Sequence, residues 1–180
     1  MILLDTQVVA WLVRHPRLLS RAARRSIEKA RFSSGLAVAS ATLFELSQMA
    51  ASGEIRPARP PAEWLRDLVR EAELRVRDIT TDVAVVAAHL PPDFPADPFD
   101  RLIAATAIVE RLPLVTADER IRESGVVETI GWPQAQAAAR SAFAWARRRR
   151  TASTSARTSC RRARMARRSW TRSARPDRRS

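Results

Sequence analysis

Short apolar runs alternate along the chain with longer segments in which apolar residues recur at helical spacing. The apolar runs predict buried strands, and the periodic segments predict amphipathic helices. The predicted strands are residues 1–5, 35–40, 76–80, 113–118 and 126–132. The predicted helices are residues 6–13, 18–31, 41–52, 60–74, 81–90 and 98–112. This alternation predicts an α/β fold with a parallel-rich central sheet covered by helices on both faces, a three-layer α/β/α arrangement.

Capping residues set the expected helix starts. Asp97 stands directly before Pro98, which predicts an N-cap followed by proline at the first helical position. Ser40 is the expected cap of the helix 41–52, and Thr81 or Asp82 that of the helix 81–90.

Four acids stand at corresponding places in this pattern. Asp5 and Asp118 each follow a predicted strand, Asp100 lies in the first turn of a helix, and Glu45 lies within a helix among apolar neighbours. In open parallel sheets, sites gather outside the carboxyl ends of the strands, so these acids can converge at one edge. Close carboxylates repel each other unless a cation compensates them. An all-oxygen ligand set favours Mg²⁺ or Mn²⁺ over zinc.

Each acid also has a purely structural interpretation. Asp5 and Asp97 can act as helix caps, and for Asp97 capping is the main role we expect. Asp100 can interact favourably with the helix dipole, and Asp118 can begin a turn or cap a helix starting at the next residue. Glu45 can form a salt bridge to an arginine. No single acid is strong evidence for a metal site. The metal hypothesis depends on the order and placement of the four acids taken together.

Three further side chains could support such a site. Ser40 and Thr6 are candidate donors that orient the carboxylates. Arg101 follows Asp100 and could pair with an acid of the site or contact an RNA phosphate.

The segments "ILLDT", "SATLFELS", "DPFDRLIAATA", "PLVTAD" and "VVETIGW" resemble the PIN-domain ribonucleases, in particular the VapC toxins of type II toxin–antitoxin pairs. They span residues 1–132, and the pairing of "DPFDRLIAATA" with "LVTAD" is the specific signal. The resemblance implies a parallel sheet between helices and Mg²⁺- or Mn²⁺-dependent RNA cleavage. The matching catalytic and metal-binding acids are Asp5, Glu45, Asp100 and Asp118, with Asp97 as an additional metal-binding acid and Thr116 as a hydroxyl beside the last one.

The resemblance also implies partners and a compartment. We expect a cognate antitoxin protein, a homodimer and an RNA substrate. The chain has one cysteine, Cys160, and its apolar N-terminus lacks the basic start of a signal peptide. No apolar run approaches the length of a membrane span. These features predict a cytoplasmic protein without a membrane segment.

The charge divides the chain into two parts. The net charge is +13, but residues 133–180 hold 15 arginines and one acid, whereas residues 1–132 are close to neutral at −1. We therefore expect a nuclease domain at 1–132 and an Arg/Ala/Ser-rich extension at 133–180, disordered over most of its length. This extension could be an RNA-binding arm in which Trp145 and Trp170 stack on bases. The interpretation we favour is a frame-shifted or read-through end without selected function.

Three functions are compatible with these observations. The first is a metal-dependent endoribonuclease that acts as a toxin. The second is a nucleic-acid-binding protein that acts through its basic extension, with the acids playing structural roles. The third is a metal-dependent phosphatase, because similar acid clusters serve phosphoryl chemistry.

Overall fold

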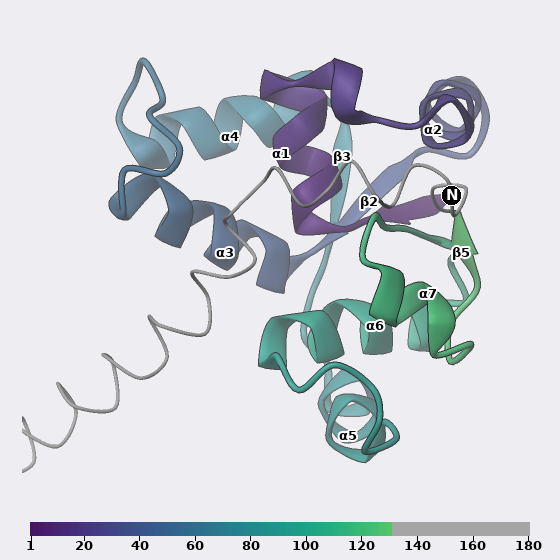
Figure 1. The fold of residues 1–180 in the computed structure, drawn as a ribbon. Coiled ribbons are helices and arrows are strands. Elements are labelled where there is room, and N and C mark those ends of the chain that lie inside the picture. Colours follow the sequence, from purple (N-terminus) through teal and green to yellow (C-terminus); the bar gives the residue numbers. More distant parts are fainter. Residues whose placement is uncertain (131–180) are drawn as a thin grey trace, which may run out of the picture. The chain divides into compact units, whose positions relative to one another are not determined.

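A computed structural model of the chain describes residues 1–130. Over this part the architecture is α/β, as the sequence predicts (Figure 1). The predicted extension at 133–180, with Cys160, Trp145 and Trp170, lies outside the described residues.

Five parallel strands form the central sheet in the order β3-β2-β1-β4-β5. Their bounds are β1 Ile2–Leu4, β2 Leu36–Ala39, β3 Leu74–Arg77, β4 Leu114–Val115 and β5 Thr129–Ile130. The chain moves outward from β1 through β2 to β3, then returns to place β4 on the other side of β1. The strand order therefore reverses between β1 and β4, the switch point at which sites form in open α/β sheets.

Seven α-helices and one 3₁₀ turn connect these strands within the described residues. Their bounds are α1 Thr6–Arg14, the 3₁₀ turn Pro16–Leu18, α2 Arg21–Ser33, α3 Ser40–Ala51, α4 Pro61–Glu71, α5 Thr81–His89, α6 Pro98–Glu110 and α7 Glu119–Glu123. The periodicity predicted every α-helix except the short α7, for which Asp118 indicated only a possible start at the next residue.

The two faces of the sheet are covered by different helices, because successive side chains of a strand point to opposite sides. Ile2 and Leu4 of β1 pack into a core with residues of α1, α2, α3 and α4. Leu3, between them, packs on the other face against α6 and α7. α5 lies outside α6 and packs against it (Figure 1). This is the predicted α/β/α layering, and it leaves the strand ends as the place where polar side chains can gather.

Two predicted helix caps are wrong by one position. Ser40 is the first residue of α3, and the cap position is Ala39, which has no side-chain acceptor. The cap of α5 is Thr80, whose hydroxyl accepts a hydrogen bond from the Val83 N–H at 3.3 Å, rather than Thr81 or Asp82. The segment offers Thr80, Thr81 and Asp82 in succession, three good capping residues, so local sequence alone does not select among them.

Candidate functional site

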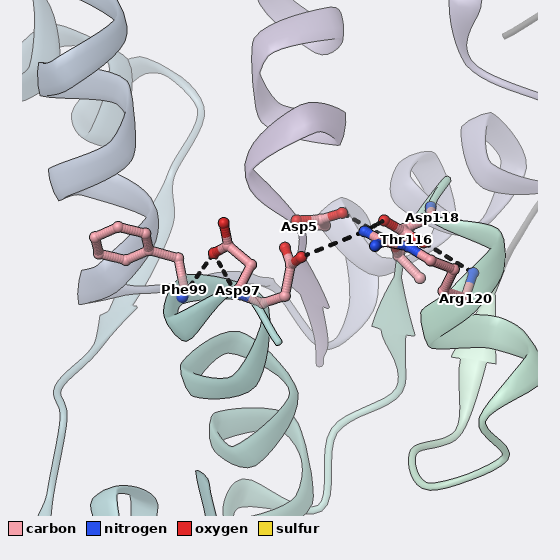
Figure 2. Close-up of polar contacts among 7 residues, drawn as sticks. Asp5, Asp97, Phe99, Thr116, Asp118 and Arg120 are labelled. Carbon is pink, nitrogen blue, oxygen red and sulfur yellow. Dashed lines mark hydrogen bonds and ion pairs between the residues drawn. The ribbon is translucent and has the colours of Figure 1, made fainter. Parts of the chain in front are cut away.

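The carboxyl ends of β1 and β4 bring Asp5, Thr116 and Asp118 together. Asp5 follows β1, and its backbone N–H donates to the carbonyl of Val115 in β4 at 3.1 Å. The Thr116 hydroxyl donates to Asp5 Oδ2 at 2.8 Å and accepts from the Asp118 backbone N–H at 3.0 Å (Figure 2). One hydroxyl thus orients the Asp5 carboxylate and fixes the backbone turn that presents Asp118.

Asp5 stands at the cap position of α1 but makes no side-chain capping bond. Its side chain is instead turned toward β4, and the residue is only 6 % exposed. A buried carboxylate costs free energy unless hydrogen bonds or a cation compensate it. The capping interpretation is therefore wrong for Asp5, and its orientation favours a role at the sheet edge.

Glu45 reaches the same edge from α3. It is 5 % exposed, and its Oε2 accepts a hydrogen bond of 2.6 Å from the hydroxyl of Thr6, the residue that follows Asp5. The Thr6 hydroxyl also lies 3.2 Å from that of Thr42 in α3. Thr6 is thus an orienting donor, as predicted, and Glu45 is turned toward the end of β1 rather than away from it. Thr42 is a neighbour that the sequence did not single out.

The start of α6 supplies two more acids. Asp97 is the N-cap: its Oδ1 accepts from the backbone N–H groups of Phe99 at 2.9 Å and Asp100 at 3.4 Å (Figure 2). Asp100, in the first turn, is 8 % exposed. The predicted capping role of Asp97 is confirmed, and the cap positions the turn from which Asp100 projects.

Asp118 caps α7 and contacts an arginine. Its Oδ1 accepts from the Arg120 backbone N–H at 2.8 Å, and its Oδ2 lies 3.1 Å from Arg120 Nη2. The same Nη2 lies 3.9 Å from Asp100 Oδ2. The hydrogen bond to Asp118 and the charges of Asp118, Asp100 and Asp97 raise the pKa of Arg120. Sequence reasoning missed this arginine, although its place two residues after Asp118 puts it in the same helical turn.

Arg101 contacts backbone carbonyls in the structure rather than an acid of the site, and its predicted contact with an RNA phosphate stays a prediction. Its guanidinium donates to the backbone carbonyls of Ala87 at 2.9 Å and Leu90 at 2.7 Å, near the end of α5. Arg101, which lies in α6, therefore connects this helix to the end of α5 through two hydrogen bonds.

The chemistry of these donors fits a hard divalent cation. Asp5, Glu45 and Asp100 are buried carboxylates from three different elements, and they offer only oxygen ligands. Within residues 1–130, however, no three Asp, Glu, His or Cys side chains are already arranged to hold a metal ion together. The acids line one region without forming a finished coordination shell, as expected for like charges that repel each other.

Comparisons with known proteins identify the class to which this fold and site belong. The family model described as "PIN domain" matches residues 2–126. The chain therefore belongs to the PIN domain family, and the family resemblance drawn from its motifs is confirmed.

One curated relative is similar over almost the same region. It is Ribonuclease VapC22 of Mycobacterium tuberculosis (strain ATCC 25618 / H37Rv), 44 % identical over 121 residues, which are 67 % of this chain and 89 % of the relative.

Two solved structures share the fold. The crystal structure of VapBC2 from Rickettsia felis bound to a DNA fragment from their promoter matches with a TM-score of 0.58 and 18 % identity, over 74 % of this chain and 100 % of that one. DNA-bound VapBC from Salmonella typhimurium matches with a TM-score of 0.55 and 20 % identity, over the same shares.

The prediction that the chain lacks a membrane segment was checked on the same part of the structure. None of the helices in residues 1–130 combines the length and apolar character needed to cross a membrane.

Proposed function

We propose that the chain is a metal-dependent endoribonuclease and the toxin of a toxin–antitoxin pair, working in the cytoplasm. The single observation that supports the proposal is the set of contacts at the carboxyl ends of β1 and β4. Thr116 bonds both Asp5 and Asp118, and Arg120 contacts both Asp118 and Asp100. Glu45 is bonded to Thr6, the residue that follows Asp5. The similarity to Ribonuclease VapC22 supports RNA as the substrate.

Asp5, Glu45, Asp100 and Asp118 would hold Mg²⁺ or Mn²⁺, with Asp97 as an additional acid at the rim. When bound, the cation supplies Lewis-acid activation of water and neutralises charge on the phosphodiester. The chain contributes orientation: Thr116 holds Asp5, Thr6 holds Glu45, and the Asp97 cap fixes the turn that carries Asp100. The described residues need supply no nucleophile, because the attacking group is water.

The proposed partners follow from the same comparisons. The structures with a similar fold are VapBC proteins bound to DNA, which supports an antitoxin as the partner of this chain. A homodimer remains part of the proposal and is tested by the mass of the purified protein in solution.

An RNA digest tests the function. We expect the purified chain to cleave RNA with Mg²⁺ or Mn²⁺ and to lose cleavage when EDTA removes the metal.

Asp100→Asn and Asp5→Asn should each reduce cleavage by at least about 100-fold, since an amide is a poorer ligand for a hard cation. Unchanged circular dichroism would show that the variants still fold. Cleavage by folded Asp100→Asn protein at the wild-type rate would overturn the proposal. The alternative is a metal-dependent phosphatase. Such an enzyme would hydrolyse small phosphate esters, whereas an endoribonuclease would cleave RNA, so an assay on both substrate classes distinguishes the two.

A further inference from the structure

Arg120 is shared between two of the acids assigned to the metal. Its Nη2 lies 3.1 Å from Asp118 Oδ2 and 3.9 Å from Asp100 Oδ2, and its Nε lies 3.4 Å from Asp118 Oδ1 (Figure 2). The arginine side chain is 58 % exposed, whereas those of Asp118 and Asp100 are 25 % and 11 % exposed. A largely exposed arginine side chain therefore contacts two carboxylates that are less accessible than itself.

The two contacts differ in strength. Asp118 is close to Arg120 in sequence, receives both Nε and Nη2, and also accepts the arginine backbone N–H. Asp100 comes from α6, and the distance of 3.9 Å between its Oδ2 and Arg120 Nη2 lies at the outer limit of an ion pair. The Asp118 pairing is thus locally determined, while the Asp100 pairing depends on how the guanidinium is turned.

A guanidinium and a divalent cation use the same oxygen lone pairs of a carboxylate. Arginine remains charged at any physiological pH, so it cannot leave the site by losing its proton. It can only withdraw by rotation, which its exposure permits. Binding of the cation to Asp100 must therefore compete with the longer of the two arginine contacts.

We propose that Arg120 is an internal counter-ion of the metal-free acids, displaced from Asp100 when a divalent cation binds. The proposal rests on the metal site of the proposed function. It assigns Arg120 a positioning role. The arginine offsets the repulsion between Asp100 and Asp118, and it sets the metal affinity below the value the acids alone would give. After displacement from Asp100 it stays bonded to Asp118 through carboxylate lone pairs that the cation does not use, since a carboxylate offers about four of them.

Calorimetric titration of the full chain with Mn²⁺, without RNA, tests the role. Arg120→Gln removes the competing charge, so we expect the Mn²⁺ dissociation constant to fall by about threefold to fivefold, as suits a partly exposed pair. Arg120→Lys keeps the charge without the forked contact and should give an intermediate value. Arg31→Gln, an exposed arginine on α2, is the charge-matched control and should change the constant less than twofold.

The nuclear magnetic resonance spectrum of arginine Nε–H groups gives a second readout, which is measured on the wild-type chain and uses a variant only to assign the signal. Mg²⁺ should shift one such resonance of the wild-type chain, the resonance that disappears in Arg120→Lys. A shift confined to that signal supports displacement, and an unchanged signal at saturating Mg²⁺ overturns it.

The outcomes separate this proposal from the proposed function. If the wild type binds Mn²⁺, Asp100→Asn abolishes binding, and Arg120→Gln binds no more tightly, then the role of Arg120 is overturned and the metal site stands. If the wild type binds no Mn²⁺, both fail.

Discussion

The hydroxyl of Thr116 donates a 2.8 Å hydrogen bond to Asp5, a residue 111 positions earlier in the chain. The bond joins the ends of β1 and β4, which are neighbours in the sheet only because the strand order reverses there. A small hydroxyl side chain therefore determines the orientation of the first acid and the position of the last.

Replacement of Thr116 by valine tests this link. Valine fills a similar volume but leaves Asp5 Oδ2 and the Asp118 N–H without this partner. We expect metal-dependent cleavage to fall by roughly 10- to 100-fold, and the free energy of unfolding to fall by about 1–3 kcal/mol. Cleavage kinetics and urea denaturation measure the two effects. Thr116→Ser keeps the hydroxyl and should retain most of both; a serine variant as impaired as valine would contradict the assignment.

Thr6 and Glu45 form the corresponding link between α1 and α3. Thr6→Val removes the 2.6 Å hydrogen bond to the buried carboxylate, so we expect a loss of stability of about 1–3 kcal/mol and weaker cleavage. Thermal denaturation with and without Mn²⁺ checks this. Since metal binding would compensate the Glu45 charge, Mn²⁺ should raise the melting temperature of the variant. A melting temperature that Mn²⁺ leaves unchanged would argue against Glu45 as a ligand.

Substitutions of Asp97 distinguish its role as a helix cap from a role as a metal ligand. Asp97→Ala should destabilise the protein by about 1 kcal/mol, because the start of α6 loses its cap. Asn is an equally good cap, so Asp97→Asn should restore stability and keep most of the cleavage. A loss in Asp97→Asn as large as that in Asp100→Asn would instead make Asp97 a metal ligand.

Deletion of the basic extension distinguishes the nuclease from a protein that acts by binding alone. A chain ending at residue 132 keeps every acid of the site, and we expect it to retain Mg²⁺-dependent cleavage. The full chain should bind RNA more tightly at low salt, since its last 48 residues hold 15 arginines. Loss of all RNA binding on deletion, with no cleavage by either chain, would favour the binding hypothesis.

Much of the fold was predictable from local pattern. Buried runs such as residues 1–5 and 35–40 gave the strands, and the Asp97–Pro98 pair fixed the start of α6. Hydrophobic pattern and proline chemistry are properties of neighbouring residues, so a single sequence carries them. The cap at Thr81 was wrong because Thr80 is an equally suitable capping residue. The cap at Ser40 was wrong because α3 follows β2 directly, so that Ser40 is already helical and the cap position falls on Ala39.

The sequence indicated candidate acids for the site, but it did not indicate their contacts. Strand ends indicated Asp5 and Asp118, and an acid among apolar neighbours indicated Glu45. The sequence could not show that Arg120 lies between Asp118 and Asp100, nor that Arg101 bonds the carbonyls of Ala87 and Leu90. Those outcomes depend on which helices pack together, which is a property of the folded chain.

The position of β1 in the middle of the sheet also bears on how the protein is made. Among the five strands of this sheet, β1 is synthesised first and acquires its second neighbour only when β4 follows, after most of the domain has been made. Asp5 can contact Thr116 only at that late moment. The proposed nuclease site can therefore form in a cell only once synthesis of the domain is nearly over.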